Sequence, residues 1–250
     1  MEEILAGRHA VCEALKAGRP LNKILLARGA AGGGLSEVLS LARGKGIPVQ
    51  WVDRRALDKM AGHTPHQGVI ALAAAKEYAP LEDLLGRAKL KGEPPFLIML
   101  DGVEDPQNLG AILRVAEACG VHGVIIPRRR SAGLSPAVAR VSAGALEYVP
   151  VARVANLNST LRSLKEQGIW AIGADAGGEE LVFDVDLTLP LVLVLGGEGK
   201  GLSPLLKRQC DMVVRLPMLG RINSLNVAAA AAALLYEAVR QRKFVPSIRT

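Results

Sequence analysis

The sequence predicts an α/β protein in which a small α/β domain precedes a larger domain built on a parallel sheet. Half of the 250 residues are hydrophobic and 22% are charged, the balance of an ordinary globular protein with room for two domains. Short, fully apolar strands such as residues 191–195 alternate with amphipathic helices, as in parallel sheets covered on both faces. Glycine and paired prolines at residues 91–95 interrupt that alternation. These three observations fix the predicted fold class.

The first domain is predicted to span residues 1–76. Apolar residues recur there with helical spacing in two segments and form short apolar runs in three others. The expected elements are a helix at 10–17 that ends at Gly18, a strand at 23–27, a helix at 35–42, a strand at 48–52 and a last strand at 69–75.

Residues 77–95 are expected to be a linker that holds a short amphipathic stretch at 81–90, and residues 96–250 form the second domain. Its first helix carries an apolar stripe at Leu109, Ile112, Leu113 and Ala116 and ends at Gly120. The remaining expected elements are strands at 96–100, 123–127, 169–173, 191–195 and 213–216, and helices at 156–167 and 223–241.

Charge and composition restrict the classes of function. The net charge is +7 with a pI near 9.5, and residues 1–76 alone carry +5, which favours a polyanionic partner. Aromatic residues make up only 3% of the chain, so stacking platforms for splayed bases are not expected. The longest apolar runs fall short of the ~18 residues of a membrane span, and the acidic start does not resemble a secretory signal.

The three cysteines are widely separated, at positions 12, 119 and 210. This spacing excludes a disulfide framework and a cysteine zinc cluster, and it favours a reducing cytoplasm. All three are expected to be small buried hydrophobes. The pair His63 and His66 is more typical of a loop than of a metal site, because Pro65 separates the two and other ligands are missing nearby. No metal is therefore expected.

Three segments of the second domain are polar or glycine-rich although the fold requires neither property. Each follows an apolar strand, and ligands bind at the carboxyl ends of strands in open α/β sheets. The first segment, residues 101–114, holds Asn108, which is expected to cap the following helix. It also holds Arg114, which lies about 140° around the helix from Leu109 at ~100° per residue and so falls outside the apolar stripe.

The second and third segments carry further polar candidates. Residues 196–203 contain four glycines around Glu198, which indicates a close backbone approach or a sharp turn. A phosphate-binding loop is excluded because glycine, rather than serine or threonine, follows the lysine. Residues 216–226 end in Asn223, Ser224 and Asn226 before an alanine-rich helix. A helix cap accounts for Asn223 or Ser224, but it does not account for all three.

Taken together, the motifs resemble a known family. The order D-G-V-x-D-P-x-N-L-G-A-x-x-R, L-G-G-E-G-x-G-L and L-P-M-x-G-x-x-x-S-L-N-V is similar to the three motifs of the SpoU/TrmH branch of the SPOUT methyltransferases. The stretches G-R-H-A-V-x-E-A-L (7–15) and H-Q-G (66–68) resemble the substrate-binding domain of that branch. The resemblance covers nearly the whole chain and looks closest to the 23S rRNA guanosine 2′-O-methyltransferases.

This resemblance implies a SPOUT-type parallel sheet with a C-terminal trefoil knot, a rare exception to un-knotted topology, preceded by a small RNA-binding domain. It implies S-adenosylmethionine as the cofactor and a homodimer with the active site at the interface and the final helix in the contact. By motif match, the functional polar set would be Asn108, Arg114, Glu198, Ser224 and Asn226. The cofactor-binding residues would be Leu195, Gly196, Gly197, Gly201, Leu216, Met218, Ser224 and Leu225.

The implied reaction is attack of a ribose 2′-oxygen on the sulfonium methyl group. The substrate would be large-subunit rRNA or an assembly intermediate, with a tRNA ribose as the alternative. A different class, a non-catalytic RNA-binding assembly factor that keeps the fold, is also open. Arginine stays protonated at ordinary pH and is a poor base. We therefore expect Arg114 to bind the substrate phosphate and polarise the hydroxyl, with Glu198, Ser224 and Asn226 completing the pocket.

Overall fold

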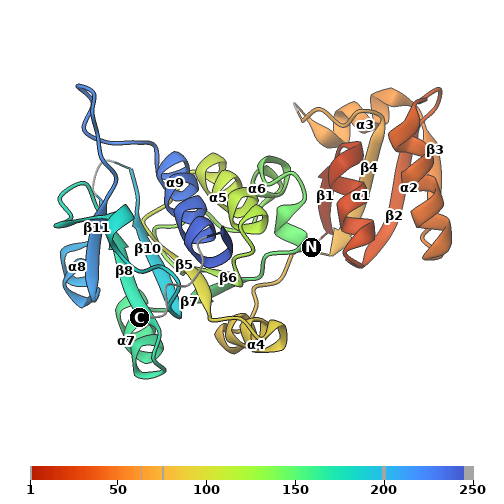
Figure 1. Ribbon diagram of the computed structural model, residues 1–250. Helices are drawn as coiled ribbons and strands as arrows, with labels where there is room; N and C mark the ends of the chain where they lie inside the picture. Colours follow the sequence, from red (N-terminus) through yellow and green to blue (C-terminus); the bar gives the residue numbers. More distant parts are fainter. Residues whose placement is uncertain (1, 63, 75, 199–200, 245–250) are drawn as a thin grey trace. The chain divides into compact units, whose positions relative to one another are not determined.

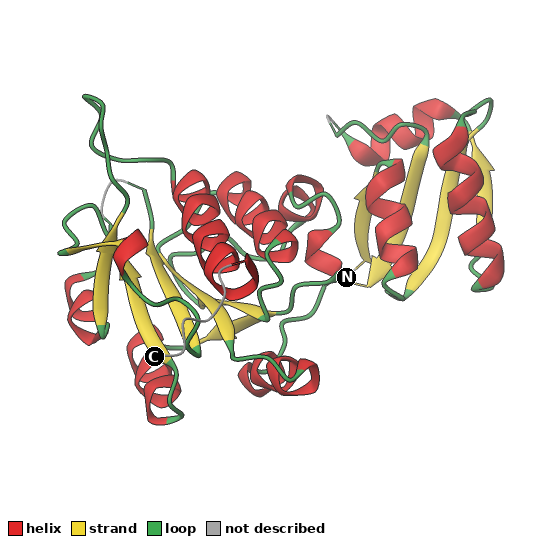
Figure 2. Ribbon diagram, in the orientation of Figure 1, coloured by secondary structure: helices red, strands yellow, loops and turns green. Residues whose placement is uncertain are grey.

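The computed structural model describes residues 2–62, 64–74, 76–198 and 201–244, which form two compact units (Figures 1 and 2). The first unit contains the residues up to Glu77 together with Leu134–Tyr148. The second contains Tyr78–Gly133 and the residues from Val149 onward. The domain limits predicted from the sequence place residues 134–148 in the second domain, whereas the contacts of these residues group them with the first unit.

The first unit is built on a four-stranded mixed sheet with the order β1-β4-β2-β3. Strand β4 runs antiparallel to β1 and β2, and β2 runs parallel to β3. The elements of this unit are β1 (Glu2–Ala6), α1 (Arg8–Lys16), β2 (Leu21–Ala27), α2 (Gly33–Gly44), β3 (Val49–Val52), α3 (Arg54–Ala61), β4 (Val69–Ala74), α6 (Pro136–Val141) and the 3₁₀ turn η1 (Ala145–Glu147).

Helix α3 covers one face of this sheet through a single fully buried side chain, Leu57. Leu57 packs against Leu25 of β2 and against Ile70 and Leu72 of β4. Because side chains alternate along a strand, Ile24 and Leu26 of β2 point to the opposite face, and both are fully buried. The sequence did not predict α3, which is strongly charged and only eight residues long.

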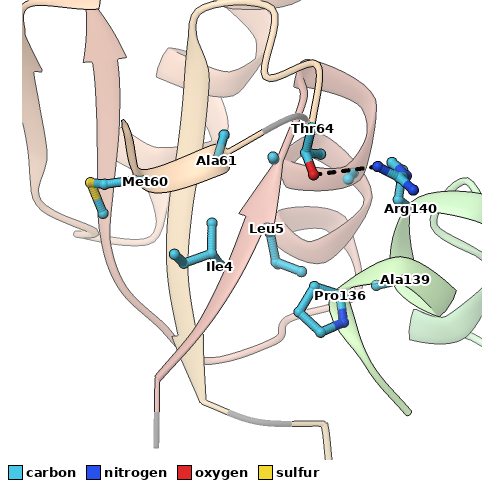
Figure 3. Close-up of a pocket in the computed structure, with 10 residues that line it drawn as sticks. Ile4, Leu5, Met60, Ala61, Thr64, Pro136, Ala139 and Arg140 are labelled. Carbon is cyan, nitrogen blue, oxygen red and sulfur yellow. Dashed lines mark hydrogen bonds between the residues drawn. The ribbon is translucent and has the colours of Figure 1, made fainter. Parts of the chain in front are cut away.

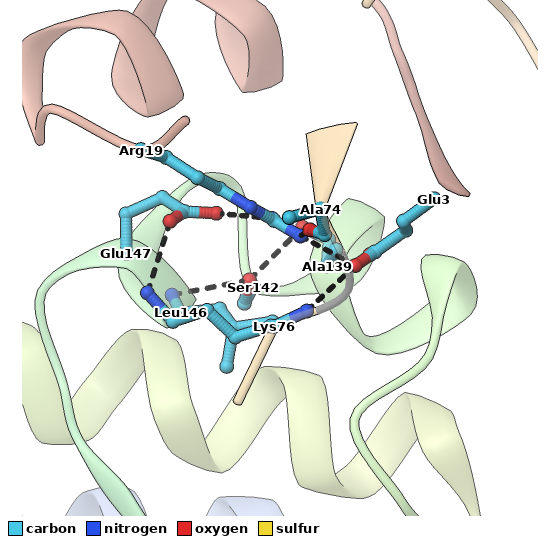
Figure 4. A network of polar contacts seen from close by, with 8 residues as sticks. All are labelled: Glu3, Arg19, Ala74, Lys76, Ala139, Ser142, Leu146 and Glu147. Atoms are coloured by element: carbon cyan, nitrogen blue, oxygen red, sulfur yellow. Dashed lines mark hydrogen bonds and ion pairs between the residues drawn. The ribbon is translucent and has the colours of Figure 1, made fainter. Parts of the chain in front are cut away.

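A buried ion network attaches the segment 134–148 to this unit (Figure 4). The Arg19 side chain, 4% exposed, donates to the carboxylates of Glu3 and Glu147 and to the carbonyl of Ala74. Lys76 forms a second ion pair with Glu147 at 3.0 Å. Buried charges require such partners, because an unpaired charge in the interior is costly. The network therefore explains why Glu147 belongs to the first unit, although Arg19 lies 128 positions earlier in the chain.

A small cavity of about 170 Å³ lies where helix α6 meets strand β1 and helix α3 (Figure 3). Its walls are mainly apolar, with Ile4 and Met60 on one side and Pro136 on the other. Arg140 of α6 donates to the hydroxyl of Thr64 at 3.3 Å across its rim. These contacts and the ion network together hold α6 on the edge strand of the first unit.

The second unit is built on a seven-stranded sheet with the order β7-β6-β5-β10-β8-β11-β9, in which all neighbouring strands run parallel. The elements are α4 (Leu81–Lys91), β5 (Phe96–Asp101), α5 (Pro106–Ala118), β6 (Gly123–Pro127), β7 (Val151–Val154), α7 (Leu157–Glu166), β8 (Trp170–Ala174), β9 (Glu180–Leu181), the 3₁₀ turn η2 (Val182–Asp184), β10 (Leu191–Gly196), α8 (Pro204–Gln209), β11 (Met212–Arg215), α9 (Val227–Val239) and the π-helix η3 (Arg240–Phe244).

Helices cover both faces of this sheet (Figure 1). Helices α5 and α9 pack together on one face, and α4, α7 and α8 lie on the other. Register explains the division: Leu97 pairs with Val192 and Met99 with Val194, and all four side chains join the core under α4, α7 and α8. The parallel sheet predicted from the apolar runs is therefore present. The trefoil knot remains a prediction.

Helix α4 lies within the segment expected as a linker, yet it is part of the second unit's core. Leu84 is fully buried and packs over strand β6. A β-carbon at Gly123 would lie 2.1 Å from Leu84 Cγ, so the helix sits on the strand only because position 123 is glycine. The sequence indicated the amphipathic stretch correctly but not its packing partner.

The end of the described chain is held near the amino-terminal ends of β5 and β10. Arg242 of η3 donates to the carbonyls of Pro94, Leu187 and Leu189, and its guanidinium lies 4.5 Å from the centroid of the Phe96 ring. Burial lowers the pKa of Arg242 to about 10. These contacts connect η3 with the start of β5 and the loop before β10.

His122 is a buried histidine, 1% exposed, that contacts the start of β5. Its Nδ1 accepts from the Phe96 amide at 3.0 Å, and its Nε2 faces Glu93 at 3.2 Å. Burial lowers the pKa of His122 more than the Glu93 carboxylate raises it.

Candidate active site

The three polar segments meet at the carboxyl-terminal edge of the parallel sheet, as their positions after strands predicted. Asn108 lies in the first turn of α5, Glu198 follows β10, and Asn226 is the N-cap of α9. Strand order produces this meeting, because β10 lies directly beside β5 although 90 residues separate Asn108 from Glu198.

Asn108, Glu198 and Asn226 form a closed triangle of hydrogen bonds. The Asn108 amide donates to Glu198 Oε1 at 2.9 Å. The Asn226 amide donates to the same oxygen at 2.7 Å and to Asn108 Oδ1 at 2.9 Å. Hydrogen bonds to a carboxylate are stronger than neutral ones, so two amide donors hold Glu198 Oε1 in place.

The orientation of the triangle is determined by a helix cap. Asn226 Oδ1 accepts from the backbone amides of Ala228 and Ala229, which directs its NH₂ group toward Asn108 and Glu198. Within the described residues, Glu198 Oε2 has no hydrogen-bond partner, and the Glu198 side chain is exposed. This oxygen is therefore available to a ligand.

Two expectations about caps were wrong. Asn108 does not cap α5; the cap is Asp105, whose Oδ1 accepts from the Gln107 amide at 2.8 Å. Pro106 at the first helical position is the signal for this arrangement, since proline is typical directly after an N-cap. Helix α9 begins at Val227 rather than at residue 223, so its cap is Asn226 rather than Asn223 or Ser224.

A cavity of about 580 Å³ adjoins the triangle. The residues expected to bind the cofactor all line it: Leu195, Gly196, Gly197, Gly201, Leu216, Met218, Ser224 and Leu225. Glu198 and Asn226 stand at its wall as well. The volume falls within the range of roughly 300–1,000 Å³ that is typical of small-molecule sites.

The glycine-rich loop forms one wall of this cavity because backbone packs there directly on backbone. A β-carbon at Gly196 would lie 2.1 Å from the carbonyl carbon of Gly201, and one at Gly197 would lie 2.0 Å from the carbonyl oxygen of Gly102. The Gly197 amide donates to the Asp101 carbonyl at 2.7 Å, which ties the loop to the end of β5. The glycines indicated a close backbone approach, and the structure locates it.

Three further cavity residues, which the sequence motifs did not indicate, lie at the end of β8 and directly after it: Ala174, Asp175 and Ala176. Burial raises the pKa of the Asp175 carboxyl, but the Lys207 ammonium at 2.9 Å and the Gly177 amide outweigh it, so the pKa lies below its usual value. Asp175 follows an apolar strand as the three recognised segments do, and that position was the available signal.

Two members of the predicted polar set lie outside the triangle. Ser224 lines the cavity. Arg114 is exposed on α5 and belongs to neither the triangle nor the described walls of this cavity. The chain's own fold therefore brings together three of the five residues and places Arg114 apart from them.

The structure also describes most of the histidines and cysteines named in the sequence. His66 contacts Asp58 and the Gly68 amide, while His63 lies outside the described residues. The described residues contain no cluster of three or more potential metal ligands and no helix long and apolar enough to cross a membrane. Cys12 and Cys119 are buried as expected, and Cys210 is partly buried.

Comparisons with known proteins cover both parts of the chain. Residues 95–236 match the model of the SpoU rRNA methylase family, and residues 4–79 match that of the RNA 2′-O ribose methyltransferase substrate-binding domain. The chain is 47% identical over 240 residues to YacO of Bacillus subtilis, whose name places it in the TrmH family of tRNA/rRNA methyltransferases. The match covers 96% of both chains.

Solved structures extend the likeness to cofactor complexes. The SpoU methyltransferase AviRb from Streptomyces viridochromogenes, in complex with S-adenosylmethionine, is 29% identical with a TM-score of 0.81, covering 96% of this chain and 90% of that one. A cofactor-bound rRNA methyltransferase from Sinorhizobium meliloti is 26% identical with a TM-score of 0.80, covering 98% and 88%.

Proposed function

The chain belongs to the SpoU family of RNA methyltransferases, which use S-adenosylmethionine, and on that premise we propose that it methylates the 2′-oxygen of a guanosine ribose in large-subunit rRNA. The observation that carries the proposal is the hydrogen-bonded triangle of Asn108, Glu198 and Asn226 at the wall of a cofactor-sized cavity. The cytoplasm, where ribosomes are assembled, is the proposed compartment.

The residues of the cavity fit this cofactor. Leu195, Leu216 and Met218 offer apolar surface for an adenine ring, and the tightly packed backbone of Gly196 and Gly197 offers polar groups without side chains in the way. The cofactor supplies a methyl group that its sulfonium already activates. The chain therefore needs to bind the donor, exclude water and orient the attacking oxygen.

Glu198 performs the orientation in our proposal. Its Oε1 is held by two amides, and its Oε2 accepts a hydrogen bond from the ribose hydroxyl and takes up the hydroxyl proton when the 2′-oxygen is methylated. This contact directs an oxygen lone pair toward the methyl group, and the fixed negative charge favours a cationic donor nearby. Asn108 and Asn226 are positioning residues for Glu198.

A homodimer completes the polar set. Arg114 lies on the exposed face of α5, so we propose that each active site receives it from the partner chain, where it binds the substrate phosphate and polarises the hydroxyl. The exposed apolar side chains Leu219 (98%), Ile222 (72%) and Leu225 (47%) belong to the segment 216–226, several of whose residues line the cavity, and they support an interface there. Tyr236 of α9 is a further exposed apolar side chain, at 56%.

The first unit is proposed to dock the RNA. It matches a substrate-binding domain model and carries the strongest net positive charge of the chain. Arg28 follows β2, and Arg54 and Arg55 follow β3 at the same edge of the sheet, because β2 and β3 run parallel. All three are exposed and form no ion pair with another described residue. Exposed, unpaired arginines are the groups that contact phosphates.

The test is transfer of labelled methyl groups to unmodified large-subunit rRNA and, separately, to unmodified tRNA, followed by nucleoside mapping. Label on a guanosine ribose of the rRNA is the expected result. Label on tRNA ribose would overturn the substrate and keep the chemistry. Cofactor binding without transfer to either RNA or to precursor particles, or the absence of cofactor binding, would favour the non-catalytic assembly factor. Glu198→Gln serves as the inactive control.

A further inference from the structure

The second unit has a further cavity, of about 670 Å³, which lies against the cofactor cavity and is called the second cavity below. The two share Gly197, Glu198, Gly201 and Val227 in their walls, and Asn108 of the triangle lines the second one. The exposed carboxylate of Glu198 therefore borders both spaces. A methyl donor and its acceptor must approach to ~3–3.5 Å, so an acceptor site has to share a wall with the donor site. This cavity meets that requirement.

The two cavities differ in charge. Among the described residues, the walls of the cofactor cavity contain no lysine or arginine, whereas the second cavity is lined by Arg130. The second cavity also has four carboxylates. Three of them already accept hydrogen bonds: Asp101 from the Ser203 amide, Asp105 from the Gln107 amide, and Glu198 from two asparagines. Glu104 and Arg130 remain as the two charged groups without a described partner.

Arg130 lies in a turn that hydrogen bonds to neighbouring residues stabilise. Its φ is +57°, a left-handed conformation that costs a non-glycine residue about 1–2 kcal/mol. Two contacts stabilise the turn from either side: Ser131 Oγ donates to the Pro127 carbonyl at 2.7 Å, and the Ala132 amide donates to the Val103 carbonyl at 2.8 Å. Val103 itself lines the cavity, so the turn is fastened to the cavity wall.

We propose that Arg130 binds a phosphate of the RNA strand that enters this second cavity, and thereby positions the acceptor ribose against Glu198. The proposal rests on the function proposed above and adds a phosphate contact from the chain's own fold to the contact assigned to Arg114. A ribose 2′-oxygen lies beside a backbone phosphate in every RNA strand. A planar guanidinium can bind two phosphate oxygens at once and so fixes both position and direction.

The test compares three charge-neutralising variants, Arg130→Gln, Arg129→Gln and Glu104→Gln. Arg129 is exposed on the same turn but does not line either cavity, which makes it the matched control. The steady-state constants for methyl transfer to unmodified large-subunit rRNA are measured at several salt concentrations. Calorimetric binding of S-adenosylmethionine reports whether each variant keeps its folded cofactor site.

Arg130→Gln is expected to raise KM for RNA about tenfold, to change kcat less than about twofold, and to lower the slope of log affinity against log salt by about 1. Arg129→Gln is expected to change KM less than about twofold. Glu104→Gln is expected to lower KM, because it removes a negative charge from a cavity that receives an anion. Cofactor affinity is expected to be unchanged in all three.

Equal effects of Arg129→Gln and Arg130→Gln on KM would overturn the proposal, since they would show that the turn attracts RNA only through its overall positive charge. An unchanged KM in Arg130→Gln, or a loss confined to kcat, would overturn it as well. If the wild type binds the cofactor but methylates neither rRNA nor tRNA, the proposed function fails separately. Direct titration of rRNA against the wild type and Arg130→Gln then decides whether Arg130 contacts RNA.

Discussion

Asn226 donates an amide hydrogen to Asn108 Oδ1 at 2.9 Å and so joins the start of α9 to the start of α5 across 118 residues of chain. The oxygen of the same side chain caps α9 through the amides of Ala228 and Ala229. One side chain therefore contributes both to helix stability and to the placement of Glu198. The two contributions use different atoms of Asn226, which makes them separable by substitution.

Asn226→Asp is expected to keep the cap and to impair methyl transfer. The new carboxylate can still accept from Ala228 and Ala229, but it loses the NH₂ donor and places a second negative charge beside Glu198. We expect kcat to fall on the order of 100-fold, the scale seen when one positioned donor is lost. Asn226→Ala additionally loses the cap, at ~1 kcal/mol. Full activity of Asn226→Asp would contradict the role assigned to the triangle.

Arg19→Ala is expected to destabilise the first unit strongly. The side chains of Glu3 and Glu147 are only 8% and 4% exposed. The substitution removes the guanidinium that both of these buried carboxylates contact. Breaking a buried ion pair from one side typically costs about 3–5 kcal/mol. Urea unfolding measures the loss, and Arg19→Ala/Glu147→Gln should recover part of it by removing one stranded charge. A loss below ~1 kcal/mol would show that the network contributes little.

Stability should decline on mild acidification because of His122. Its pKa in the folded protein lies below the unfolded value of about 6.5, so the unfolded chain binds the proton more readily. The contribution of His122 is thus complete above ~pH 6.5 and is lost as pH falls below that value, with a slope of at most ~1.4 kcal/mol per pH unit. Urea unfolding between pH 7.5 and 5.5 measures this slope. An equal slope in His122→Gln would assign it to another group.

The cysteine thiols are expected to be inert in the native protein. Burial raises the pKa of Cys119 to about 11 and that of Cys210 to about 12, and it raises the pKa of Cys12 as well. Since the thiolate is the reactive form, a disulfide-exchange reagent at pH 8 should label the folded chain slowly and all three cysteines after unfolding. Rapid labelling of the native protein would contradict the burial described for these thiols.

RNA affinity is expected to depend on salt through the first unit. If Arg54 and Arg55 contact phosphates, their joint replacement by glutamine should lower the slope of log affinity against log salt by about 2. Cofactor binding should be unaffected, because both residues belong to the first unit, whereas the cavity proposed to hold the cofactor belongs to the second. An unchanged slope would indicate that another basic cluster, rather than Arg54 and Arg55, contacts the RNA phosphates.

Much of the fold and part of the site follow from local sequence patterns. The apolar runs that became β5, β6 and β10 are short, uninterrupted and bounded by turn residues, so periodicity alone identifies them. Asn108, Glu198 and Asn226 stood out because polar residues followed such runs.

The remainder depends on contacts that local patterns do not encode. The ion pair between Arg19 and Glu147 spans 128 residues, and it is through such distant contacts, together with the packing of α6 near β1, that α6 belongs to the first unit. Arg130 is one of three consecutive arginines, and its place beside the second cavity follows from a turn conformation rather than from composition.

Because the first unit includes residues up to Tyr148, it cannot be completed early during synthesis. Arg19 leaves the ribosome 128 residues before Glu147, which at ~5–20 residues per second is an interval of roughly 6–26 seconds. During that interval β1 has not yet been covered by α6. Of the two carboxylates that contact Arg19 among the described residues, Glu3 has been synthesised and Glu147 has not. A fragment that stops at residue 76 would remain permanently in this state, so the nascent chain and the truncated domain share one incomplete edge.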